Sequence, residues 1–135
     1  MSFPVGEIDG VDSAAAAKLK AVGIRTSDKL LDAAKSLQGR KMLSEKTGID
    51  ERNLLRLANK IDRMRIKGIG QEYADLLQIA GVDTVRELTY RNPKRLAERM
   101  KAINDKRKLV RVLPSESTVG RWIEHAKKLP LKITY

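Results

Sequence analysis

The chain contains no cysteine, and its single histidine is His125. The missing thiols exclude disulfides, thiolate catalysis and cysteine-based zinc sites, and one histidine cannot build a histidine-rich metal site. The sequence also has no Walker phosphate loop and no spacing of carboxylates that is typical of a metal site. We therefore expect a protein that is not an enzyme and that carries no cofactor.

Aromatic residues make up only 4% of the sequence, although hydrophobic residues make up 41%. Leu, Ile, Val and Ala must therefore fill the core, which favours short packed helices over a β-sandwich. The chain has no apolar run long enough to span a membrane and no basic amphipathic segment with interfacial Trp and Phe. Because its first residues lack a secretory leader, we expect a cytoplasmic protein that does not bind membranes.

Acidic residues are outnumbered: 17 Asp and Glu stand against 28 Lys and Arg, which gives a formal net charge of +11. A positive field attracts polyanions, so nucleic acid is the first expected partner. Basic residues are densest between positions 91 and 111, where Arg91, Lys94 and Arg95 can share one helix face. We expect this stretch to form an electrostatic track for nucleic acid, and the alternative is a solvated helix face.

The sequence repeats itself at a separation of 58 positions. The matched pairs are Ile8 and Ile66, Gly10 and Gly68, Ala16 and Ala74, Leu19 and Leu77, Gly23 and Gly81, and Thr26 and Thr84. Each copy ends in a segment with the apolar spacing of a buried helix face, provided that the second copy is longer around residues 104–112. The repeat predicts an all-α fold in which residues 1–63 and 64–129 pack as one pseudo-symmetric unit, followed by a tail over 130–135.

Capping residues predict where the helices begin. Helices are expected over residues 13–22, 71–80 and 93–106, and glycines at 23 and 81 end the first two. Capping side chains are expected at Asp12 or Ser13 and at Thr26, Asp50, Thr84, Asn92 and Ser115. The tail after residue 129 is expected to be extended if it is ordered.

The sharpest motif is Gly68-Ile69-Gly70, an apolar residue between two glycines that joins two helical segments. It resembles the helix-hairpin-helix motif, in which the glycines permit a tight turn and the apolar residue fills the angle between the helices. The resemblance implies sequence-independent binding of a DNA backbone by amides at the start of the following helix. The expected nucleic-acid-binding residues are Arg65, Lys67, Gly68, Ile69, Gly70, Gln71, Arg91, Lys94 and Arg95. The alternative is a helix corner used only for packing or protein contacts.

The first copy departs from this pattern, because Asp12 stands where the second copy has Gly70. A carboxylate there would cap its own helix and repel phosphate. Few residues precede the first hairpin, so we expect the last helix, near residues 116–128, to fold back and supply the missing partner. The first hairpin is then structural and the second one functional.

Over nearly the whole chain the arrangement is similar to an uncharacterised bacterial family of tandem helix-hairpin-helix proteins. The expected function is binding of duplex DNA without sequence preference and without enzymatic activity. The alternative is a protein adaptor with an acidic partner. Salt separates the two, because phosphate binding weakens steeply with ionic strength and a hydrophobic protein interface does not.

Overall fold

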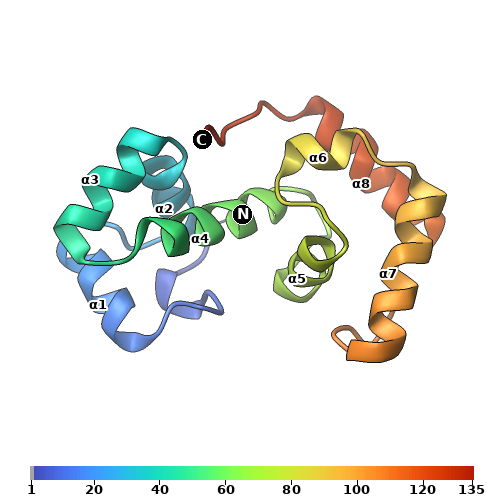
Figure 1. Ribbon diagram of the computed structural model, residues 1–135, viewed down its shortest axis with the longest axis horizontal. Coiled ribbons are helices and arrows are strands. Elements are labelled where there is room, and N and C mark those ends of the chain that lie inside the picture. The colour runs from blue at the N-terminus through green and yellow to red at the C-terminus, as the bar shows by residue number, and fades with distance from the viewer. Residues whose placement is uncertain (1) are drawn as a thin grey trace. The chain divides into compact units, whose positions relative to one another are not determined.

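The computed structural model describes residues 2–135, and this part of the chain is built from helices (Figure 1). The elements in order are the 3-10 helix η1 (Val5–Glu7), α1 (Ser13–Ala21), α2 (Ser27–Ala34), α3 (Leu37–Thr47), α4 (Glu51–Arg63), α5 (Gln71–Ile79), α6 (Val85–Thr89), α7 (Pro93–Arg107) and α8 (Glu116–Lys128). The all-α prediction is confirmed for the described residues. None of their helices is long and apolar enough to cross a membrane.

The chain forms two compact units. Unit 1 contains the residues up to Ile61 together with Lys132–Tyr135, and unit 2 contains Asp62–Leu131. Each unit buries its own set of Leu, Ile, Val and Ala side chains. The pseudo-symmetric packing of the two copies stays a prediction.

Unit 1 packs α1, α2, α3 and the first part of α4 around an aliphatic core. Leu19, Leu30, Ala34 and Leu54 are fully buried there. Helix α3 has no predicted counterpart in the sequence analysis, because its interior includes Gly39 and only one of its large apolar side chains, Leu43, is buried. Its ends are nevertheless defined by a Ser36 cap and by Gly48 in the left-handed conformation.

Unit 2 packs α5 to α8 around its own core, in which α8 contacts both α6 and α7. The buried face of α8 consists of Val119, Trp122, Ile123 and Ala126, as its helical spacing predicts. All four side chains belong to the core of unit 2. The expectation that this helix folds back onto the first hairpin is therefore wrong.

The last four residues complete unit 1. Ile133 is buried in its core, and the Thr134 N–H donates to the Lys35 carbonyl at 2.8 Å. The guanidinium of Arg40 donates to the carbonyls of Ala34 and Thr134 at 3.0 and 2.7 Å. Burial lowers the pKa of Arg40, and the charge of Tyr135 partly offsets that effect. The end of the chain is thus held by defined contacts.

Most predicted caps are confirmed. In the first turns of their helices, the side chains of Asp12, Thr26, Asp50, Asn92 and Ser115 accept backbone N–H groups. Thr84 is the exception, since its hydroxyl bonds to the carboxylate of Glu87. The backbone N–H of Val85 donates instead to Asp62, at 2.9 Å from Oδ2. A carboxylate distant in sequence therefore caps α6.

Candidate nucleic-acid interface

The turn between α4 and α5 needs the backbone freedom of glycine at Gly68 but not at Gly70. Gly68 has φ +94°, where an L side chain is strained, and a Cβ there would lie 3.3 Å from Nε1 of Trp122. Ile69 is buried, and its N–H donates to the Ile66 carbonyl at 3.1 Å. Gly70 is different, because its φ of −87° suits any residue and a Cβ would meet nothing within 4 Å. The space beside Gly70 is therefore open.

The first turn of α5 lacks a side-chain cap, because its N-cap residue is Gly70. The ladder of the helix begins with the Ala74 N–H, which donates to the Gly70 carbonyl at 2.9 Å. The amides of Glu72 and Tyr73 lie outside that ladder, and the end of the helix carries a partial positive charge. Such an end offers donors to an anion.

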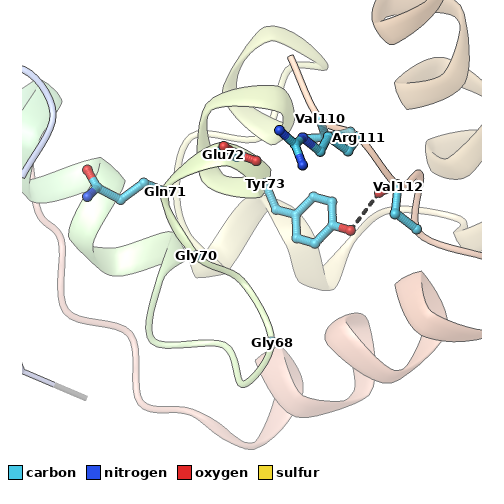
Figure 2. Close-up of a pocket in the computed structure, with 8 residues that line it drawn as sticks. All are labelled: Gly68, Gly70, Gln71, Glu72, Tyr73, Val110, Arg111 and Val112. Atoms are coloured by element: carbon cyan, nitrogen blue, oxygen red, sulfur yellow. Dashed lines mark hydrogen bonds between the residues drawn. The ribbon is translucent and has the colours of Figure 1, made fainter. Parts of the chain in front are cut away.

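These amides border a hollow of about 400 Å³, which we call the α5 hollow (Figure 2). It is lined by Gly68, Gly70, Gln71, Glu72, Tyr73, Val110, Arg111 and Val112. The Tyr73 hydroxyl donates to the Val112 carbonyl at 2.6 Å, which fixes the segment after α7 beside the hairpin. Figure 2 shows the Gln71 side chain directed away from Tyr73 and Arg111. Gln71 therefore borders the hollow with its side chain turned aside.

The first hairpin has the same backbone at the equivalent position but different chemistry. Asp12 has φ −77° and ψ 174°, and Gly70 has φ −87° and ψ −170°. The Asp12 carboxylate accepts the Ala15 N–H at 2.7 Å, as predicted. The start of α1 is thus occupied by its own negative charge, whereas the start of α5 is open.

Two of the predicted basic residues serve the fold. The Arg65 guanidinium donates to Asp62 at 2.7 Å and to the Pro130 carbonyl at 2.6 Å. Arg91 donates to the Ala80 carbonyl at 3.2 Å, at the end of α5. Bound in this way, Arg65 and Arg91 act as internal hydrogen-bond donors.

The other predicted basic side chains, those of Lys67, Lys94 and Arg95, are exposed. Lys94 and Arg95 lie in the first turn of α7 and are not among the residues that line the α5 hollow. Arg111 does line it and was not selected as a site residue. The sequence places Arg111 within the basic stretch, but only the bond from Tyr73 to Val112 shows why its segment lies at the hairpin.

The buried charge of Arg63 ties the end of α4 to α5 and to the segment that follows α5. Arg63 is 4% exposed and donates to the carbonyls of Ala74 and Asp83, both at 2.8 Å. Burial lowers the pKa of Arg63, and the nearby carboxylates of Asp75, Asp83 and Asp62 oppose this effect. No local pattern in the sequence indicates this role, because Arg63 follows the apolar face of α4 and its acceptors lie 11 and 20 residues away.

Among residues 2–135, no three His, Asp or Glu side chains are grouped closely enough to hold a metal ion. A family model described as "Domain of unknown function (DUF4332)" matches residues 9–129. The chain belongs to this family. The DUF4332 match begins just before α1 and ends just after α8. No curated protein and no solved structure matches the chain.

Proposed function

We propose that this DUF4332 protein binds the backbone of duplex DNA without reading its sequence and has no enzymatic activity. The observation that carries the proposal is the start of α5, where Gly70 supplies neither a cap nor a side chain that blocks approach. A phosphate oxygen placed there accepts N–H bonds from the first turn and interacts favourably with the helix dipole. Such contacts position a protein on DNA without specifying bases.

The proposal includes the interpretation of the chain as two diverged helix-hairpin-helix copies. In support, Gly10 and Gly68 both have positive φ, as do Gly23 and Gly81. The helices follow the same order, since α5 and α6 begin 58 positions after α1 and α2, and α8 begins 65 positions after α4. The excess length lies partly in α7, which has 15 residues where α3 has 11, and partly in the segment after it, which brings Arg111 to the α5 hollow.

Charge supports a polyanionic partner. The net charge is +11, and the exposed Lys67 and the hollow-lining Arg111 are basic groups near the α5 amides. Glu72 is the one carboxylate among the residues that line the hollow, so the positive end of the helix and Arg111 must outweigh it. We assign Lys94 and Arg95 to the electrostatic track and not to the hairpin site.

The second candidate function is a protein adaptor with an acidic partner. Val112 favours it, because this apolar side chain is 70% exposed while its residue lines the α5 hollow. A protein interface centred on Val112 depends on apolar contact and tolerates salt, whereas phosphate binding does not.

The test is a fluorescence-anisotropy titration of a labelled random-sequence duplex with the full chain, at about 50 and 200 mM salt. Wild type should bind and should weaken at the higher salt. Gly70→Asp should bind much more weakly, because its carboxylate occupies the amides and repels phosphate. Gln78→Glu is the matched control, since it adds the same charge to an exposed position at the other end of α5.

Two results would contradict the proposal. One is a lack of binding at low salt. The other is an equal loss of affinity in Gly70→Asp and Gln78→Glu, which would assign the effect to net charge and not to the hairpin amides. Binding that is insensitive to salt and is lost on Val112→Ser would favour the adaptor.

A further inference from the structure

Unit 2 contains a second hollow beside the hairpin, which we call the α8 hollow. It measures about 500 Å³ and is lined by Lys67, Gly68, Tyr73, Thr118, Arg121, Trp122 and His125. Gly68 and Tyr73 line the α5 hollow as well, so the two hollows meet at the same turn.

The wall of the α8 hollow contains no carboxylate, and two of its residues carry positive charge. Lys67 and Arg121 are both exposed. The Arg121 guanidinium donates to the hydroxyl of Thr118 at 3.1 Å and to that of Ser117 at 3.2 Å, on its own helix. Its partners are neutral, so its charge is not cancelled by an ion pair within residues 2–135. The hollow therefore attracts anions.

Two ring nitrogens add neutral donors to the same wall. The Lys67 backbone N–H donates to Nδ1 of His125 at 3.1 Å, so the proton of the neutral imidazole is on Nε2. Trp122 is only 4% exposed, and its Nε1 lies 3.3 Å from the position of a Cβ on Gly68. Its N–H makes no hydrogen bond to another described residue, and its nitrogen is not among the fully buried polar atoms without a partner, so it can donate to a ligand. The wall thus presents the ring N–H groups of His125 and Trp122, which make no hydrogen bond to another described residue.

We infer that the α8 hollow is a second phosphate subsite. It rests on the proposed function, in that the phosphate belongs to bound DNA. The cationic groups of Lys67 and Arg121 neutralise the phosphate, and the N–H groups of His125 and Trp122 donate to its oxygens. The hydrogen bond from Lys67 to His125 holds the imidazole in the tautomer that this requires. DNA can present such a group as an internal phosphodiester or as a terminal phosphate.

Trp122 is the only tryptophan, so its indole N–H gives a single signal in the nitrogen-correlated NMR spectrum of the full chain. Adding duplex DNA with hydroxyl ends should shift this signal in the same titration as the Glu72 amide. A 5′-phosphorylated duplex of the same sequence distinguishes the sources. If both duplexes shift the indole signal equally, the group in the α8 hollow is an internal phosphodiester. If only the phosphorylated duplex shifts it, the group is a terminal phosphate.

Arg121→Gln should weaken duplex binding about 10-fold, the effect of one charge-assisted hydrogen bond. It should also reduce the slope of log affinity against log salt by about 1, the value for one phosphate contact. The matched control is Lys128→Gln, which removes the same charge from an exposed position on α8 outside the hollow. This control should change both quantities much less. Thermal unfolding of both variants checks that they are folded.

The outcomes separate this inference from the proposed function. If the duplexes bind while the indole signal stays in place and Arg121→Gln behaves like Lys128→Gln, the subsite is refuted and the hairpin proposal stands. If no duplex binds but inorganic phosphate shifts the indole signal, the hairpin proposal fails and the subsite stands. If no duplex binds and inorganic phosphate also leaves the indole signal in place, the subsite and DNA binding are both refuted.

Discussion

Replacing Gly70 with aspartate should stabilise unit 2 while it weakens DNA binding. The backbone permits the change, because φ at Gly70 is −87° and a Cβ there has no neighbour within 4 Å. Asp12 shows the result to expect, since it adopts nearly the same backbone and caps α1 through a 2.7 Å bond to the Ala15 N–H. The equivalent donor in α5 is the Tyr73 amide.

The gain in stability has three sources. As a cap, aspartate stabilises the helix by a few tenths of a kcal/mol more than glycine does. The interaction of its charge with the helix dipole contributes about 0.3 to 1 kcal/mol. Replacing glycine lowers the entropy of the unfolded chain, which contributes about 0.4 to 1 kcal/mol. Repulsion from Glu72 in the same hollow offsets part of the sum. We expect a net gain of about 1 kcal/mol, which raises Tm by about 4 to 8 °C in a domain of this size.

The assay is thermal unfolding followed by the fluorescence of Trp122, whose ring is in the core of unit 2 and therefore reports on that unit. Anisotropy with labelled duplex is measured on the same samples. If Gly70→Asp has a higher Tm and no longer binds DNA, the amide site is supported, because a misfolded variant would not unfold at a higher temperature. Higher Tm with unchanged binding would refute the reasoning, since a capped helix would then bind DNA as well as an open one.

Three further substitutions test the scaffold. Asp62→Ala leaves the buried N–H of Val85 without its acceptor and should cost about 2 kcal/mol in urea unfolding with an unchanged m-value; a loss below about 0.5 kcal/mol would contradict the bond. Gly68→Ala places a side chain at φ +94° and should cost about 1 to 2 kcal/mol, so an unchanged Tm would contradict the assigned turn. Arg40→Ala should free the end of the chain, seen as faster hydrogen exchange of the Thr134 amide, and unchanged exchange would show that Arg40 does not hold it.

Local chemistry explains what the sequence predicts well. The Asp12 cap, the Asn92 cap before Pro93 and the turn at Gly68 each depend on a few neighbouring residues, so the pattern suffices to locate them. The sequence does not predict helix α3, because its apolar residues follow the helical spacing only weakly and Gly39 interrupts the pattern. Its stability depends on packing within unit 1, which a local pattern does not contain.

Contacts between distant residues explain what the sequence misses. Thr84 looks like a cap, but Asp62 takes that role from 23 residues away. The sequence predicts that Arg65 and Arg91 are surface charges. In the structure, their guanidinium groups donate hydrogen bonds to acceptors of unit 2. Conversely, Arg121 reaches the hairpin only because α8 packs beside it, which no spacing in the sequence indicates.

The most direct test of the central claim follows the backbone amides by NMR while duplex DNA is added to the full chain. The claim is that the open first turn of α5 holds a phosphate. It predicts that the amide signals of Glu72 and Tyr73 shift most, with smaller changes at Ala14 and Ala15, where the Asp12 carboxylate caps α1. Binding that leaves Glu72 and Tyr73 in place and moves signals elsewhere would contradict the claim.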